Sequence, residues 1–180
     1  EAVIWAQIAS NTRSVPPDNF MQSVVANGLA LSADGSLIVA DTSRGAIWEI
    51  GVNSDGSAGE PAMMLQSPLL EGVDGIALDS KGRLWAAVNE RNALVVVNDG
   101  QADEVHKNDN AGPLEFPAAI AFIGEVGYVP NYDRPRGENL AEDGTSSAGI
   151  GSSIARFGLL VSPTIGIGTT SYIAAACPSR

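Results

Sequence analysis

The sequence contains a single cysteine, Cys177, and a single histidine, His106. One cysteine excludes an internal disulfide and a cysteine metal cluster. A Ser-His-Asp triad would have to use His106, and no Gly-x-Ser-x-Gly nucleophile elbow accompanies it. We therefore expect neither a disulfide framework nor a serine hydrolase of that type. We predict that His106 lies at the surface, in a polar connector over residues 104–110.

Positive charge and long apolar runs are also scarce. Ten Lys and Arg residues face 21 Asp and Glu residues, which gives a formal net charge of −11. Such an acidic chain is not expected to bind nucleic acid or an anionic membrane surface, because both carry negative charge. No segment approaches the roughly 18 consecutive apolar residues of a membrane span. The composition permits cation binding and leaves the cellular compartment open.

The dominant feature of the sequence is a repeat. The segment Asn27–Gly35 reads NGLALSADG and recurs at Asp74–Gly82 as DGIALDSKG, and an apolar stretch follows each copy. A weaker third copy begins at Pro117 and has Ala118 at the position of Asn27 and Asp74. These equivalent positions are 47 and 44 residues apart. A period of that length with several short strands per unit is typical of a β-propeller blade.

We therefore predict an all-β fold, a β-propeller built of four-stranded antiparallel blades. In the first repeat the expected strands are residues 28–32, 37–41, 46–52 and 63–66, with Gly-containing turns between them. The second repeat follows the same plan, with its third strand at 93–98. The third repeat predicts strands at 118–122, 126–130 and 153–160, separated by a long polar insertion that begins at Asn131 and ends at Gly151.

The chain is predicted to form a single partial propeller domain over residues 1–180, with repeats at 27–73, 74–116 and 117–163 and a tail at 164–180. Residues 4–8 are similar to the third strand of the first repeat, so we expect about three blades and part of another. Closed propellers contain roughly four to eight blades. We therefore expect a missing segment of a longer chain, or a second copy of this one, to complete the ring.

The segments Val25–Leu29 (VANGL) and Gly72–Ile76 (GVDGI), each followed by a turn and a strand, resemble the SMP-30/gluconolactonase/LRE family. The resemblance covers residues 27–160 and would correspond to the last three blades of the family's six-bladed propeller. It implies a divalent-metal-dependent lactonase that acts on a small-molecule lactone. It also implies that Asn27 and Asp74 are metal ligands and that Asp74 is the catalytic base.

The chemistry of these residues agrees with that implication. The first residues of neighbouring innermost strands lie at the mouth of the central channel, where an amide oxygen and a carboxylate suit a hard cation. Ca²⁺ is the ion expected first, while Zn²⁺, Mg²⁺ and Mn²⁺ remain open. The metal would polarise the lactone carbonyl while Asp74 assists the attacking water. A third ligand, a Glu in the family, has no counterpart in this sequence, and Ala118 cannot bind a metal.

Other interpretations stay open at this stage. Asn and Asp before Gly also serve as plain turn formers at the start of a strand. The chain could be a non-catalytic module, similar to NHL repeats, that binds a protein or a carbohydrate. A strictosidine-synthase-like propeller shares the architecture but not the Asn27–Asp74 pair. Asp41, Asn89 and Asn131 follow the second strands of their repeats, and we expect them to share a structural turn role.

Overall fold

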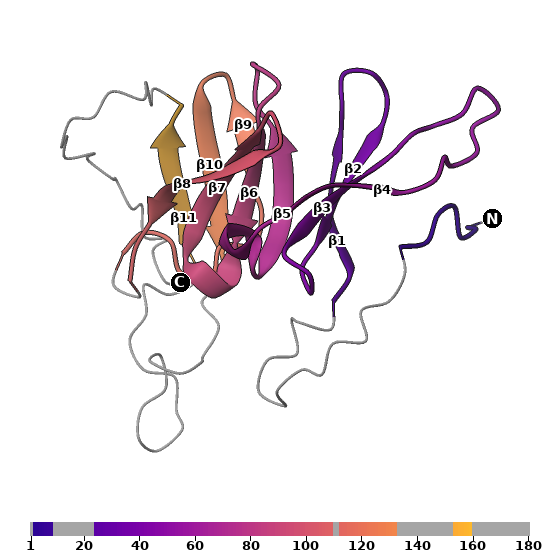
Figure 1. The fold of residues 1–180 in the computed structure, drawn as a ribbon. Helices are drawn as coiled ribbons and strands as arrows, with labels where there is room; N and C mark the ends of the chain where they lie inside the picture. The colour runs from indigo at the N-terminus through magenta and orange to yellow at the C-terminus, as the bar shows by residue number, and fades with distance from the viewer. Residues whose placement is uncertain (1, 9–23, 110–111, 133–152, 160–180) are drawn as a thin grey trace.

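The computed structural model describes residues 2–8, 24–109, 112–132 and 153–159. Three antiparallel sheets follow one another along the chain and stand side by side, as Figure 1 shows. They are successive blades of a β-propeller, so the predicted all-β architecture is confirmed. Within the described ranges, no helix is both long and apolar enough to cross a membrane.

Each blade is a meander in which strands that are adjacent in sequence pair with one another. The first blade contains β1 (Ala26–Leu31), β2 (Leu37–Asp41), β3 (Ala46–Ile50) and β4 (Ala62–Gln66). The second contains β5 (Val73–Leu78), β6 (Leu84–Val88), β7 (Ala93–Asn98) and β8 (Gln101–Lys107). The third contains β9 (Ala121–Ile123), β10 (Val126–Asn131) and β11 (Ser153–Gly158). Two short 3-10 helices, η2 (Pro68–Leu70) and η3 (Asn89–Arg91), connect strands at one end of the blades.

The structure corrects two predicted strands. The inner strand of the third blade begins at Ala121 rather than at Ala118. The Ala118 carbonyl accepts a hydrogen bond from Gly75 N of the neighbouring blade at 2.9 Å, while Ala118 N donates to the Pro130 carbonyl of its own blade at 3.0 Å. Regular pairing with β10 therefore begins only at Ala121. Residues 4–8 form no strand; in this segment Trp5 Nε1 donates to the Gly56 carbonyl at 2.7 Å. Most of the insertion, residues 133–151, and the tail at 164–180 with Cys177 lie outside the described residues.

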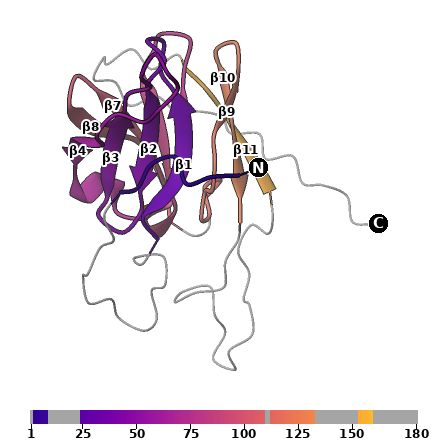
Figure 2. The same cartoon turned by 90° about the vertical axis from the view of Figure 1, so that its right-hand side faces the viewer.

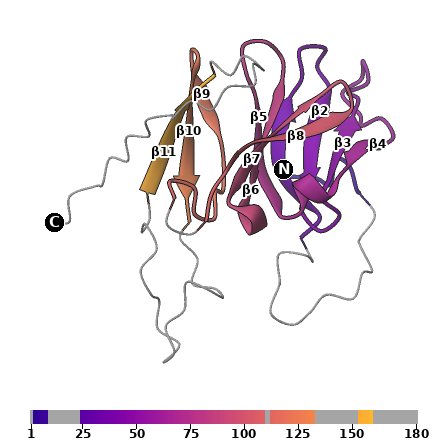
Figure 3. The same cartoon turned by 60° about the vertical axis from the view of Figure 1, so that its left-hand side comes forward.

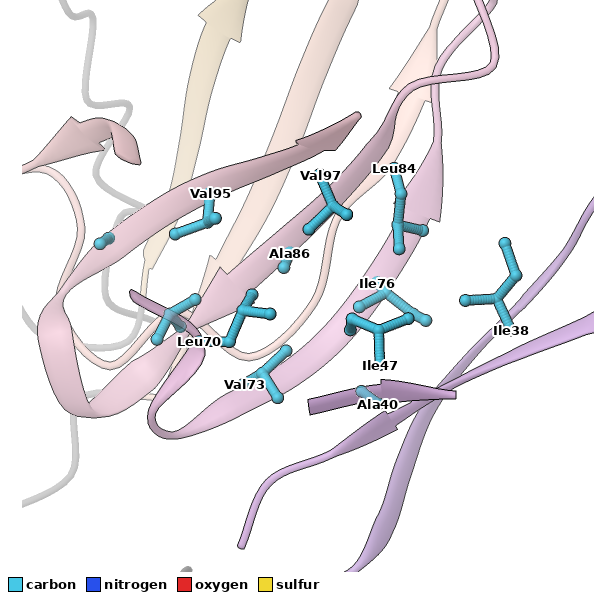
Figure 4. Packing of buried hydrophobic residues seen from close by; sticks show 12 residues of the cluster. Ile38, Ala40, Ile47, Leu70, Val73, Ile76, Leu84, Ala86, Val95 and Val97 are labelled. Carbon is cyan, nitrogen blue, oxygen red and sulfur yellow. The ribbon is translucent and has the colours of Figure 1, made fainter. Parts of the chain in front are cut away.

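The apolar core lies between the blades. One cluster joins the first blade to the second, and Figure 4 shows Ile47 and Ala40 on one side of it facing Ile76 and Val73 on the other. A second cluster joins the second blade to the third around the buried Trp85. The Trp85 ring lies 5.0 Å from that of Phe157 and 5.9 Å from that of Phe122, measured between centroids. Blade-to-blade packing therefore supplies the hydrophobic stabilisation of the fold.

The prediction of a surface position for His106 is wrong. His106 lies in strand β8 and is half-buried, and its ring lies 5.4 Å from the Phe157 ring of the third blade. Burial lowers the pKa of the imidazole from its usual 6.5. Most residues around His106 in the sequence are polar and suggested a surface loop. In a strand, however, every second side chain points toward the adjacent blade, so a buried residue can have polar sequence neighbours.

The innermost strands of neighbouring blades touch through their backbones at two glycines. A Cβ atom on Gly28 would lie 2.3 Å from the carbonyl oxygen of Asp74. A Cβ atom on Gly75 would lie 2.5 Å from the Cα atom of Ala119. No side chain larger than hydrogen fits at these points without moving one blade away from the next.

We predict that Gly75→Ala lowers the free energy of unfolding by about 1–3 kcal/mol, because the added methyl group must push two backbones apart. The matched control is Gly51→Ala, since a Cβ atom there would meet nothing within 4 Å. Urea denaturation of both variants and the wild type measures the effect. Equal stabilities of the two variants would contradict the close packing at Gly75.

A second prediction concerns pH. Since the folded state lowers the pKa of His106, the unfolded chain takes up a proton first as the pH falls below about 6.5. The stability that the neutral imidazole provides is therefore present above pH 6.5 and is lost as the pH falls toward the folded pKa. His106 is the only histidine, so His106→Leu should remove this slope. Unfolding curves between pH 5 and 7.5 test it, and an unchanged slope in the variant would refute it.

Candidate functional site

The innermost strands of the first two blades share an irregularity where they begin. The pairing of β1 with β2 shifts register between Ala26 and Leu29, and the pairing of β5 with β6 shifts between Val73 and Ile76. These interruptions contain Asn27–Gly28 and Asp74–Gly75, the residues that the sequence singles out. A bulge of this kind leaves residues outside the ladder and changes the direction of their side chains.

The structure brings Asn27 and Asp74 together. Oδ2 of Asp74 accepts a hydrogen bond from Asn89 Nδ2 at 3.2 Å, and the Asp74 carboxylate also accepts one from the side chain of Asn27. Burial raises the pKa of Asp74 above its usual value, and the two hydrogen bonds only partly oppose that change. The site therefore holds a half-buried carboxylate between two amide groups.

Asn27 is positioned by a buried threonine. Its Nδ2 donates to Thr42 Oγ1 at 3.1 Å, and the Thr42 hydroxyl donates to the Val73 carbonyl at 2.6 Å. This chain of bonds runs from the first blade into the inner strand of the second. The Asn27 side chain uses its nitrogen as the donor in this chain of bonds, so its amide oxygen takes no part in it.

Two site residues differ from the sequence prediction: it did not single out Thr42, and it gave Asn89 a structural turn role. Each follows the second strand of its blade and lies 15 residues after the side chain that it binds, Asn27 or Asp74. The sequence prediction placed Asp41 and Asn89 at equivalent positions. The register instead aligns Asp41 with Val88, because they pair with Ala26 and Val73 respectively. The repeated spacing of 15 residues was the signal that could have identified the Thr42–Asn89 pair.

Asp41 and Asn131 have structural roles, as expected. Asp41 is fully buried, with Oδ1 accepting from Ser43 Oγ at 2.9 Å and Oδ2 from Arg44 Nη1 at 2.5 Å. Asn131 is buried, and its Nδ2 donates to the Pro113 carbonyl at 2.8 Å. Asp41 holds the turn that follows β2, and Asn131 holds the segment that leads into the third blade, so both side chains are engaged in structural hydrogen bonds.

In the third blade the site loses its polar character. Ala118 stands where the other blades carry Asn27 and Asp74, and only its carbonyl takes part, as the acceptor for Gly75 N. Tyr132 follows the second strand here; it is largely exposed, and its ring lies 5.9 Å from that of Phe116. The candidate site is therefore confined, among the described residues, to the junction of the first and second blades.

The oxygen donors of this junction suit a divalent cation. A half-buried carboxylate whose ionised form burial disfavours would gain from a nearby positive charge. Carboxylate and amide oxygens are the ligands that Ca²⁺ and Mg²⁺ prefer. The described residues contain no group of three or more His, Cys, Asp or Glu side chains that could hold a metal. Two protein ligands, Asn27 and Asp74, would thus need further oxygen ligands such as water.

A hollow of about 430 Å³ lies at the same end of the first blade. It is bounded by the turn at residues 42–45 on one side and by residues 66–68 and Glu71 on the other. Thr42 belongs both to this hollow and to the hydrogen-bonded site. The surroundings are polar, with Gln66 Nε2 donating to the Arg44 carbonyl at 3.0 Å.

Solved structures share this fold. A luciferin-regenerating enzyme superposes with a TM-score of 0.57 at 19% identity, over 74% of this chain and 45% of that one. A chain of a nidogen/laminin complex gives 0.55 at 20% identity, over 76% of this chain and 45% of the other. A gluconolactonase from Xanthomonas campestris gives 0.51 at 18% identity, over 79% and 47%. The chain thus spans less than half the length of each of these proteins.

No curated protein sequence matches the chain at a significant level. The profile of the SMP-30/gluconolactonase/LRE-like region, however, matches residues 17–127. The matched stretch is more than half of the chain and includes Asn27, Thr42, Asp74 and Asn89. The chain belongs to the SMP-30/gluconolactonase/LRE-like family.

Proposed function

We propose that the chain supplies the metal-binding and catalytic side chains of a divalent-metal-dependent lactone hydrolase. The observation that carries the proposal is the contact of the half-buried Asp74 carboxylate with Asn27 and Asn89. This contact lies within the part of the chain that matches the family. The structural likeness to a gluconolactonase supports the propeller fold. The contact of Asp74 with Asn27 and Asn89 supports the proposed hydrolysis.

Asp74 is the proposed base. A carboxylate is a better proton acceptor when its pKa is raised, and burial acts on Asp74 in this direction. The amide of Asn89 donates to Oδ2 and so fixes the orientation of the carboxylate. The carboxylate would take a proton from the water that attacks the lactone carbonyl, and the ring-opened hydroxy acid would be the product.

Asn27 and Asp74 are the proposed metal ligands, and Ca²⁺ is the ion that their oxygen donors favour, with Zn²⁺, Mg²⁺ and Mn²⁺ as alternatives. A divalent cation bound there polarises the carbonyl of the substrate. Thr42 keeps the nitrogen of Asn27 engaged at 3.1 Å, so the amide oxygen is directed away from Thr42.

We predict that Asp74→Asn is more stable than the wild type at pH 7. Because the folded state raises the pKa of Asp74 above 3.8, it favours the protonated carboxyl, and ionisation at neutral pH costs stability. An amide has the same shape without the charge. The advantage should shrink as the pH falls through the folded pKa and should vanish below 3.8, where the carboxyl group is protonated in both the folded and the unfolded state. Thermal melts at pH 7 and pH 4 test this, and a variant less stable at pH 7 would contradict it.

The function itself is tested by titrating Ca²⁺ into metal-stripped protein and by following the hydrolysis of glucono-δ-lactone in a pH-stat. Asp74→Ala and Asn27→Ala should each abolish saturable metal binding, and Asp74→Ala should abolish hydrolysis. Asp103→Ala is the matched control, because Asp103 is an exposed carboxylate of strand β8 and its removal changes the charge equally.

Equal metal binding by the wild type, Asp74→Ala and Asp103→Ala would show that the ion does not bind at the proposed site. Absence of hydrolysis with each of the four ions would favour the second candidate, a non-catalytic propeller module that binds a protein or a carbohydrate. The nidogen/laminin likeness shows the fold alone and does not decide between the two.

A further inference from the structure

Asn27 is followed by Gly28, and the sequence contains no other Asn-Gly pair. In such a pair the backbone nitrogen of the glycine can attack Cγ of the asparagine, because glycine has no Cβ atom to hinder the approach. The new N–Cγ bond closes a succinimide ring, the Cγ–Nδ2 bond breaks, and the proton of the attacking nitrogen leaves with the ammonia. Water then opens the ring to an aspartate or an isoaspartate. The reaction consumes one water and needs no other reactant.

Two hydrogen bonds hold the side chain of Asn27. Its Nδ2 atom donates to Thr42 Oγ1 at 3.1 Å, and its side chain also donates to the Asp74 carboxylate. The Thr42 hydroxyl gives its one proton to the Val73 carbonyl at 2.6 Å, so Oγ1 can only accept from the amide. Thr42 is 2% exposed, which keeps water from competing for this bond. The nitrogen that would leave as ammonia is therefore bound by both blades.

The backbone of this pair is held as well. The attack requires the peptide plane between Asn27 and Gly28 to turn until the glycine nitrogen faces the side chain. The Gly28 backbone lies so close to the second blade that a Cβ atom there would stand 2.3 Å from the Asp74 carbonyl oxygen. Figure 2 shows β1 as the inner edge of the first blade, and in Figure 3 β5 stands beside the strands of that blade. The plane can turn only when the two blades move apart at this point.

We propose that Asn27 is the site at which this chain deamidates, and that Thr42 controls the rate by holding the amide. The register shift in β1 leaves Asn27 and Gly28 outside the regular ladder. The bonds from the Asn27 side chain to Thr42 and Asp74 are therefore the restraint that ladder pairing does not supply. The contact that forms the candidate site also protects it from chemical damage.

Either product would alter the junction of the first two blades. An aspartate at position 27 sets a second carboxylate beside Asp74, and the two like charges repel. An isoaspartate lengthens the backbone by one carbon atom where the packed backbones leave no room for it. Deamidation involves neither metal binding nor lactone hydrolysis, so it can occur whether or not the chain is a lactonase.

The test compares the folded wild type, Thr42→Val and Thr42→Ser during incubation at mildly alkaline pH, with the wild type in guanidinium chloride as the unprotected reference. Mass spectrometry of the tryptic peptide over residues 14–44 measures conversion at Asn27. The folded wild type should convert more slowly than the unfolded chain. Thr42→Val should convert about fivefold faster than the folded wild type, the factor equivalent to one net hydrogen bond. Thr42→Ser keeps the hydroxyl and should stay close to the wild type.

Val129→Ala is the matched control for a general loss of stability. Val129 is buried in the cluster between the second and third blades, so its truncation loosens the fold without touching the bonds of Asn27. Equal acceleration by Val129→Ala and Thr42→Val would overturn the local role of Thr42, as would a Thr42→Val chain that converts no faster than the wild type. Equal rates in the folded and unfolded wild type would overturn the protection, and earlier conversion of another asparagine in the folded chain would overturn the site.

Discussion

The close approach of backbones at Gly28 and Gly75 is the constraint on which the rest of the structure depends. Each glycine lets the inner strand of its blade lie against the inner strand of the next, with a carbonyl or Cα atom where a side chain would otherwise be. The larger apolar side chains farther out then meet in the clusters between the blades. The same approach brings Asn27, from one blade, to the carboxylate of Asp74, from the next. Packing and the candidate chemistry thus share one geometric cause.

The half-buried carboxylate of Asp74 lowers the stability of the fold, and the packing of the surrounding blades offsets this loss. Burial disfavours the ionised form of Asp74, and the amides of Asn89 and Asn27 compensate for only part of that loss. Functional carboxylates are commonly held in such environments because the same burial that destabilises the charge makes the group reactive toward protons and cations. The buried bond from Thr42 to the Val73 carbonyl ties the two blades together beside this carboxylate.

Much of the fold could be predicted from the sequence, because a repeat fixes many elements at once. The expected second strand at Leu37–Asp41 and third strand at Ala93–Asn98 coincide with β2 and β7. The contacts between blades could not be predicted, because the sequence of one repeat does not say which residues of the next it touches. His106 was placed at the surface for this reason, and the inner strand of the third blade was started three residues early.

The candidate site, too, could be predicted from the sequence only in part. The contact between Asn27 and Asp74 agrees with the pairing that the family resemblance implied, while their assignment as metal ligands remains a proposal. The supporting residues Thr42 and Asn89 depend on strand register, since a shift of one residue exchanges Asp41 for Thr42. Neighbouring residues of a strand point to opposite faces of the sheet. A prediction that is correct to within one residue therefore still selects the wrong side chain.

The hydrogen bond from Gly75 N to the Ala118 carbonyl has a mechanical consequence. It joins two blades at their innermost edges, where the backbones already touch, while the outermost strand of the first blade, β4, keeps most of its side chains in solvent. The movement that breaks the fewest contacts is then a rotation of one blade relative to the next about this inner line. Between the first and second blades the corresponding inner line is the approach of Gly28 to the Asp74 carbonyl. A rotation about it separates the outer strands first and changes the distance between Asn27 and Asp74 least. Thermal motion of the blades would therefore widen the periphery of the array and leave the geometry at the channel nearly constant.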